Sequence, residues 1–214
     1  MPPSPNFGER RGGLRPSLVV IHYTAMDSCA AARARLCDPA AEVSAHWLIS
    51  ETGDAEALVP EEMRAWHAGA GSWCGQGDIN SRSIGIELAN AGRQPFPEPQ
   101  MMALEVVLRG IGLRWGIGPD GVIGHSDMAP GRKTDPGPRF DWRRLACAGL
   151  SVWPEPGKPG DFRADLAAFG YPDADPDVLL AAFRLRFRPW ATGPLDDTDR
   201  ALVAGLLDAS AAGA

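Results

Sequence analysis

Short apolar segments of strand length alternate with helical patterns over the first 150 residues of this 214-residue chain, and this alternation limits how it can fold. Residues 18–23 are apolar and largely β-branched, which is typical of a buried strand. Residues 83–89 also predict a strand, in which Ile84, Ile86 and Leu88 share one face and Glu87 lies on the other. Because strands and helices alternate, we expect an α/β domain.

The remaining patterns complete that domain. Two glycine-rich stretches without periodicity, residues 65–81 and 126–138, are expected to be long loops of the kind that carry binding residues. The other expected elements are a helix capped by Asp27 or Ser28 and ending near residue 36, strands at 43–49 and 55–59, an amphipathic helix from Pro97 or Pro99 to about Gly116, a short strand at 121–124 and a short helix at 141–146.

A segment rich in proline and glycine, residues 151–160, separates this domain from the tail. Three helical patterns follow it, over residues 162–169, 177–187 and 198–207. We therefore expect a catalytic unit in residues 1–150 with its core in 18–146, a linker in 151–160, and a small three-helix module in 161–214.

The charge balance and the start of the chain bear on partners and location. There are 21 basic and 27 acidic residues without a basic cluster, so nucleic acid is not an expected partner. No apolar stretch approaches the roughly 20 residues that span a bilayer, so membrane insertion is not expected. The first residues lack the apolar core of a signal peptide, and the cysteines lack Cys-x-x-Cys spacing. Both features favour a cytoplasmic protein; the oligomeric state does not follow from the sequence.

His22, His125 and Asp135 are the residues with the clearest chemical meaning. Two imidazoles and one carboxylate give zinc three ligands and leave a fourth position open, as catalytic zinc sites require. His22 ends one expected strand, and His125 follows another. From these residues alone, however, a hydrolytic metal site and ordinary buried histidines both stay open.

Six segments in a fixed order reduce this ambiguity. Together they resemble the zinc-dependent N-acetylmuramoyl-L-alanine amidases of the amidase-2 class, over about residues 18–145; this class includes peptidoglycan-recycling amidases and is related to peptidoglycan recognition proteins. The segments are VIHYT at 20–24, VSAHWLI at 43–49, AWHAG at 65–69, SIGIELAN at 83–90, GHSD at 124–127 and KTDPGP at 133–138. The tail resembles a peptidoglycan-binding three-helix module through FGY at 169–171, AFRLRF at 182–187 and GPLDDT at 193–198.

The resemblance implies a fold with a mixed central β-sheet flanked by helices, and it assigns roles. It implies that zinc is the cofactor and that His22, His125 and Asp135 bind it. Phage-type relatives carry cysteine where Asp135 stands, so the carboxylate favours the recycling branch. Glu87 corresponds to the catalytic glutamate, which moves a proton from water to the leaving amine, and Lys133 to a basic residue that stabilises the oxyanion.

For substrate binding, the same motifs single out further polar residues. His67 is the better candidate for a substrate contact, whereas His46 either contacts substrate or supports the core beside the site. Asn80, Arg82 and Asn90 either line the cleft or are ordinary surface residues.

The expected reaction is hydrolysis of the amide between the lactyl group of N-acetylmuramic acid and L-alanine. An expected cytoplasmic location favours 1,6-anhydro-muropeptides from cell-wall recycling as substrate, whereas the tail favours polymeric cell wall. A non-catalytic peptidoglycan-binding protein and a zinc peptidase or deacetylase of another kind are the alternatives.

Overall fold

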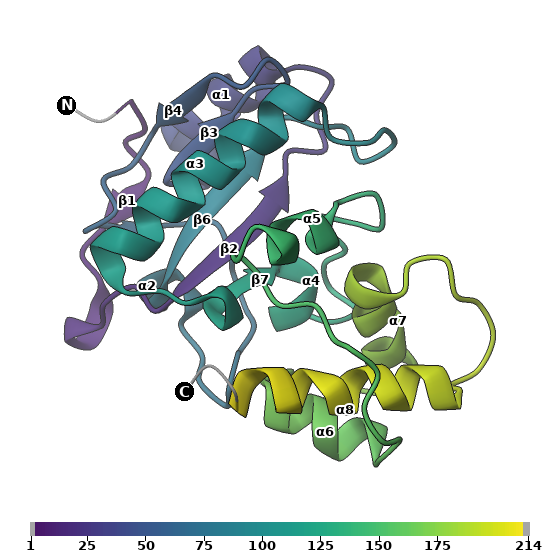
Figure 1. Ribbon diagram of the computed structural model, residues 1–214. Helices are drawn as coiled ribbons and strands as arrows, with labels where there is room; N and C mark the ends of the chain where they lie inside the picture. Colours follow the sequence, from purple (N-terminus) through teal and green to yellow (C-terminus); the bar gives the residue numbers. More distant parts are fainter. Residues whose placement is uncertain (1–2, 212–214) are drawn as a thin grey trace.

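A five-stranded mixed β-sheet forms the centre of the protein in the computed structural model, which describes residues 3–211 (Figure 1). Its strands follow the order β4-β3-β6-β2-β7; β3, β6, β2 and β7 are parallel, and β4 is antiparallel to β3. A separate antiparallel pair joins β1 (Phe7–Gly8) to β5 (Arg64–Ala65). The strands of the sheet are β2 (Leu18–Tyr23), β3 (Trp47–Ile49), β4 (Ala55–Ala57), β6 (Ser83–Leu88) and β7 (Val122–Gly124). The expected α/β fold with a mixed central sheet is confirmed.

Helices cover both faces of this sheet. Figure 1 shows α3 (Glu98–Trp115) crossing in front of the sheet and the C-terminal helices gathered at the lower right. The other helices are α1 (Cys29–Cys37), α2 (Ile79–Arg82), α4 (His125–Met128), α5 (Trp142–Cys147), α6 (Phe162–Phe169), α7 (Pro176–Phe187) and α8 (Asp197–Ala211), with short 3₁₀ turns at 11–13, 39–41 and 119–121.

The alternation of side chains along β2 decides which residues reach which face. Val19 and Ile21 pack in the cluster that α3 and α5 complete, whereas Leu18 and Val20 belong to the cluster on the opposite face. His22 continues the second set and therefore lies away from α3. In β6, Ile84, Ile86 and Leu88 join the α3 cluster, which leaves Glu87 on the same face as His22, as the pattern predicts.

The C-terminal helices share their core with the sheet. Phe162, Leu166 and Phe183 from these helices lie in one buried cluster with Val20 of β2 and Ile123 of β7. The structure describes residues 161–211 of the expected C-terminal module. Residues 212–214 of that module, and residues 1–2 of the unit expected at 1–150, lie outside the described part of the chain. The C-terminal helices thus pack on the sheet through apolar contacts.

The connecting segment is bound along its course. Residues 151–160, which are all described, contain no helix or strand, but the Gly157 N–H donates to the carbonyl oxygen of Ala201 in α8 at 2.8 Å. A Cβ atom on Gly205 would lie 1.7 Å from the carbonyl oxygen of Glu155, so only glycine allows this approach. Residues 151–160 therefore form an extended segment that packs against α8.

A buried ionic cluster joins α4 to the C-terminal helices. Asp127 of α4 accepts hydrogen bonds from the Gly124 N–H at 2.8 Å, from Arg186 Nη1 at 2.7 Å and from the hydroxyl of Tyr171. Arg186 also donates to the carbonyl oxygen of Val122 at 3.1 Å, and both Asp127 and Arg186 are almost fully buried. Because two of the three partners of Asp127, Arg186 and Tyr171, belong to the tail, the position of α4 depends on α7 and on the chain before it.

Three expected segments differ from the structure, because their backbone groups form other hydrogen bonds than the sequence pattern predicts. The strand expected at 43–49 begins only at Trp47, because the Ser44 N–H donates to the carbonyl oxygen of Trp66 instead. The loop expected at 126–138 starts within helix α4, and the Asp127 carboxylate of this helix accepts from the N–H of Gly124, the residue that caps it. The loop expected at 65–81 contains α2.

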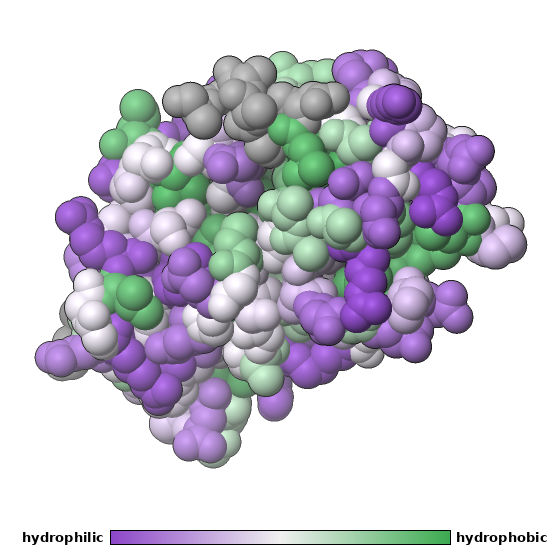
Figure 2. Space-filling view, turned by 90° about the horizontal axis from the view of Figure 1, so that it is seen from below, coloured by the Kyte–Doolittle hydropathy of each residue, from purple (hydrophilic) through white to green (hydrophobic). Residues whose placement is uncertain are grey.

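The surface seen from below, where α6 and α8 lie, mixes hydrophilic residues with smaller hydrophobic patches (Figure 2). Among residues 3–211, no helix has the length and apolar character needed to cross a membrane.

We expect Arg186→Met to lower the free energy of unfolding by about 3–5 kcal/mol, because it leaves the buried Asp127 carboxylate without its cation. Urea denaturation followed by circular dichroism measures this loss. Arg163→Met, which removes the exposed pair with Asp173, serves as the control and should leave the midpoint unchanged. A change in the Arg186 variant as small as that of the control would show that the ionic cluster does not hold the tail.

Candidate metal centre and active site

Three candidate ligands meet at the carboxyl ends of neighbouring parallel strands. His22 lies near the end of β2, His125 directly follows β7, and Asp135 comes from the loop after α4. One ligand atom from each lies within 4.8 Å of the other two. Asp135 Oδ2 is 2.9 Å from His22 Nδ1 and 3.1 Å from His125 Nδ1, and all three residues are buried. The structure therefore brings the three predicted ligands together.

The outer nitrogens of both histidines also have partners. His125 Nε2 lies 2.8 Å from the carbonyl oxygen of Ala68, which can only accept, so Nε2 carries a proton. His22 Nε2 lies 3.0 Å from Nδ1 of His67. Arg132 donates to the carbonyl oxygens of Ala68 and Ala70 and so holds this loop beside the site. Such outer hydrogen bonds orient metal-binding imidazoles.

The donor set fits a divalent metal such as zinc. When Nε2 of an uncharged imidazole carries the proton, its Nδ1 presents a lone pair. In His125 this lone pair faces the Asp135 carboxylate, an arrangement that a cation bound between the two would satisfy. Ligand atoms of a tetrahedral zinc lie roughly 3.3 Å apart when the zinc–ligand bonds are about 2.0–2.1 Å. The observed separations of 2.9 and 3.1 Å are close to that spacing.

Burial changes the acid–base properties of the site. Burial, helped by the neighbouring His125, lowers the pKa of His22 to about 4, so the ring is uncharged at neutral pH. Burial raises the pKa of Glu87 to about 8; the charge of Asp135 adds to the shift and Lys133 opposes it. Among the described residues, Glu87 Oε2 has no hydrogen-bond partner. A carboxyl group with a raised pKa and an unused oxygen is suited to proton transfer.

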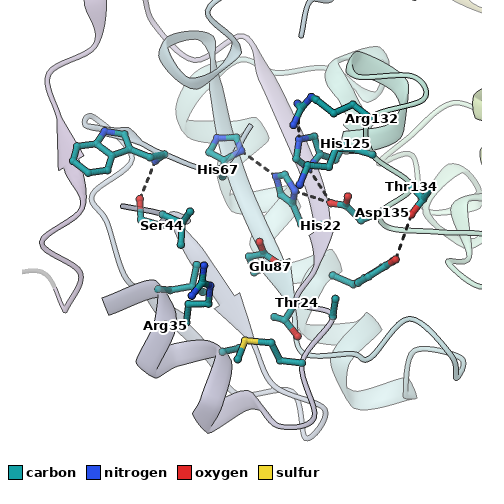
Figure 3. A pocket seen from close by; sticks show the side chains of 18 residues that line it. His22, Thr24, Arg35, Ser44, His67, Glu87, His125, Arg132, Thr134 and Asp135 are labelled. Atoms are coloured by element: carbon teal, nitrogen blue, oxygen red, sulfur yellow. Dashed lines mark hydrogen bonds and ion pairs between the residues drawn. The ribbon is translucent and has the colours of Figure 1, made fainter. Parts of the chain in front are cut away.

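These groups line one pocket of about 370 Å³ (Figure 3). His67, His22, His125 and Asp135 follow one another along one side, with Glu87 beside them and Arg35 of α1 opposite. Glu87 and His22 are adjacent residues in the parallel pairing of β6 with β2. Lys133 also lines the pocket, and its ammonium group has no hydrogen-bond or ion-pair partner in the described part of the chain. The pocket thus combines three candidate metal ligands, a carboxyl group and an ammonium group without a partner.

Of the residues expected to bind substrate, only His67 lines this pocket. The other four are buried and use their polar atoms elsewhere. His46 Nδ1 accepts from the Gly85 N–H, and Asn80 Oδ1 accepts from the N–H groups of His67 and Ala68. Arg82 donates to the carbonyl oxygens of Trp73 and Gln76, and Asn90 bonds within its own turn, to Gly92 and Gln94. These side chains thus support the backbone around the site, and the expectation that His46, Asn80, Arg82 and Asn90 contact substrate stays a prediction.

Arg35 and Arg132 line the pocket but do not stand out in the sequence. Arg35 shares one face of α1 with the buried Ala32 and Leu36, so helical spacing could have placed it. Its guanidinium group has no ion-pair partner among residues 3–211. No spacing rule would have found Arg132, because its loop follows no periodic pattern.

Comparison with known proteins gives a consistent set of relatives. The sequence matches the family described as N-acetylmuramoyl-L-alanine amidase (Amidase_2) over residues 12–138. N-acetylmuramoyl-L-alanine amidase AmiD of Escherichia coli K12 is 35% identical over 233 residues, covering 91% of this chain and 83% of AmiD. The 1,6-anhydro-N-acetylmuramyl-L-alanine amidase AmpD of Salmonella typhimurium SL1344 is also 35% identical, covering 67% of this chain and 86% of AmpD.

Solved structures extend the likeness to the tail. AmiD in complex with the substrate anhydro-N-acetylmuramic acid-L-Ala-D-gamma-Glu-L-Lys has a TM-score of 0.81 at 33% identity, covering 95% of this chain and 98% of that one. AmpDh3 of Pseudomonas aeruginosa in complex with anhydromuramic pentapeptide has a TM-score of 0.82 at 32% identity and covers 94% of each chain. With this coverage, the C-terminal helices have counterparts in both structures.

We expect the purified protein to bind one equivalent of divalent metal and Asp135→Asn to bind it at least tenfold more weakly, because the variant loses a negatively charged ligand. Elemental analysis after dialysis and competition with a chromophoric chelator measure both quantities. Asp120→Asn, a change at an exposed carboxylate, is the control. Equal affinities in the two variants would exclude Asp135 as a ligand.

Proposed function

Because this chain belongs to the N-acetylmuramoyl-L-alanine amidase family, we propose that it uses zinc, held by His22, His125 and Asp135, to hydrolyse the bond between the lactyl group of N-acetylmuramic acid and L-alanine. The observation that carries this proposal is the convergence of those three side chains in the pocket that also contains Glu87. Zinc supplies Lewis-acid chemistry at such a site and lowers the pKa of water toward about 7.

Glu87 is the proposed proton carrier. It lies beside His22 in the pairing of β6 with β2 and lines the same pocket. As a carboxylate, Glu87 accepts the proton of the attacking water, and as a carboxylic acid it donates that proton to the leaving nitrogen of L-alanine. Burial raises the pKa of Glu87 to about 8. Near neutral pH, both the carboxylate and the carboxylic acid form of Glu87 are therefore accessible.

Two cations provide the proposed contacts with negative charge. Lys133 is two residues before Asp135, and its free ammonium group stabilises the oxyanion that develops on the lactyl carbonyl oxygen. Arg35, on the opposite wall, is placed to bind a carboxylate of the stem peptide, because its guanidinium group has no ion-pair partner in the described residues. His67, the remaining expected substrate contact, is already bonded to His22 through Nδ1.

The proposed substrate is a 1,6-anhydro-muropeptide, the class of molecule bound by AmiD and AmpDh3 in their solved complexes. We retain residues 161–214 as a second unit of peptidoglycan-binding type, with residues 151–160 as its connection. Its apolar packing on the sheet supports a fixed position beside the catalytic unit. A cytoplasmic location stays a prediction, which cell fractionation tests.

We expect Glu87→Gln to keep its zinc but to lose a factor of about 10² to 10⁴ in kcat, because the amide cannot carry the proton. Release of free stem peptide from an anhydro-muropeptide, followed by liquid chromatography, measures the rate, and metal analysis measures zinc. Glu56→Gln, which removes only the surface pair with Arg33, is the control. Full activity in Glu87→Gln would refute the assigned role.

Substrate preference is tested separately, by comparing kcat/KM for a soluble anhydro-muropeptide with the rate on intact sacculi under the same conditions. We expect a preference of at least tenfold for the soluble substrate, since the solved complexes of AmiD and AmpDh3 contain anhydro-muropeptides. A clear preference for sacculi would instead support the alternative, an amidase of polymeric cell wall.

A further inference from the structure

A chain of hydrogen bonds leads from His22 to the backbone of α2. His22 Nε2 lies 3.0 Å from His67 Nδ1, a contact drawn in Figure 3. His67 Nε2 lies 3.1 Å from the hydroxyl of Ser83, the first residue of β6. That hydroxyl donates to the carbonyl oxygen of Ile79 at 2.6 Å. The chain thus begins at a proposed zinc ligand and ends at a helix carbonyl.

The end of this chain fixes the direction of every bond in it. A carbonyl oxygen only accepts, so the single proton of the Ser83 hydroxyl is used by Ile79. Ser83 must then accept from His67, which places the proton of the His67 ring on Nε2. An uncharged imidazole has one N–H, so His67 Nδ1 accepts from His22. His22 is thereby held with its proton on Nε2 and its Nδ1 lone pair facing Asp135.

Packing holds His67 where this chain requires it. A Cβ atom on Gly85 would lie 2.4–2.6 Å from the His67 ring, so the missing side chain at position 85 makes room for the imidazole. The His46 ring lies edge-on at a centroid distance of 5.7 Å. The His67 N–H donates to Asn80 Oδ1 at 3.1 Å, which fixes the backbone. The orientation of His67 is therefore determined by three neighbouring elements of the fold.

We propose that His67 and Ser83 are positioning residues that set the tautomer of His22, so that its Nδ1 is ready to bind zinc before the metal arrives. This assigns His67 a role in the metal site in place of the substrate contact expected from the sequence. The inference rests on the proposed zinc site. It concerns residues that do not touch the metal, and it leaves the ligand set unchanged.

The matched variants separate hydrogen bonding from packing. Ser83→Ala removes the acceptor at the end of the chain. The leucine and asparagine side chains introduced by His67→Leu and His67→Asn have nearly the same shape. Only asparagine offers an oxygen near the position of Nδ1 that can accept from His22. Ser4→Ala is the control, because the buried Ser4 hydroxyl also donates to a carbonyl oxygen, that of Leu36, at 2.6 Å, and Ser4 neither lines the pocket nor belongs to the chain from His22 to α2.

Two measurements are made on each variant. Long-range ¹H–¹⁵N spectra of the zinc-free, histidine-labelled protein report which ring nitrogen of His22 carries the proton. Competition with a chromophoric chelator gives the zinc dissociation constant. Circular dichroism establishes that each variant is folded.

We expect the wild-type protein and Ser4→Ala to show His22 protonated on Nε2. Ser83→Ala and His67→Leu should show a mixture of the two tautomers and bind zinc about 10- to 100-fold more weakly, the usual cost of losing an outer hydrogen bond to a ligand. His67→Asn should bind zinc more tightly than His67→Leu.

The outcomes distinguish this inference from the zinc site on which it rests. A wild-type protein that binds no zinc would contradict the proposed site, whatever its tautomers. If the wild type binds zinc but Ser83→Ala and His67→Leu keep both the wild-type affinity and the wild-type tautomer, the positioning role is overturned. Equal zinc affinities of His67→Asn and His67→Leu would overturn it as well.

Discussion

The parallel pairing of β2 with β6 and β7 is the constraint on which the rest of the site depends. In this register His22 lies beside Glu87, and the chain that leaves β7 begins with His125. Parallel strands end at the same edge of a sheet, so residues far apart in the sequence meet there. A slip of one residue in β2 would move His22 to the face that α3 covers, because side chains alternate. The apolar residues of β2 and β6 prevent that slip.

Burial of Asp127 links this edge of the sheet to the tail. Its carboxylate accepts from the Gly124 N–H at the start of α4, and also from Arg186 of α7 and from Tyr171, which lies between α6 and α7. His125 lies two residues before Asp127 in the same short helix. A helix of four residues has little stability of its own, so these tertiary contacts hold the ligand. The tail thus helps to support the candidate metal centre.

The polar interior of the site is kept in order by hydrogen bonds that end on backbone groups. All four histidines of the chain are in the described part, and each has at least one ring nitrogen bonded to a named partner: His22 to Asp135 and His67, His46 to Gly85 and Met63, His67 to Ser83, and His125 to Ala68. Burial lowers the pKa of His22, His46 and His67, so that these three rings favour the uncharged imidazole, and their hydrogen-bond partners then decide which nitrogen keeps the proton. Such an ordered, buried donor set fits the cation that we propose for this site.

The sequence by itself determined the family, the mixed α/β fold, the face on which Glu87 lies and the approximate limits of the three C-terminal helices, because these follow from motif order and from periodicity, which are local. It also singled out His22, His125 and Asp135 together. Only the tertiary structure decided that His67 contacts His22, that Asn80, Arg82 and Asn90 serve the backbone, that Arg35 faces the pocket, and that the tail shares its core with the sheet. These facts depend on contacts between residues distant in sequence. The spacing of residues along the chain does not say which distant group a buried polar side chain will bond to.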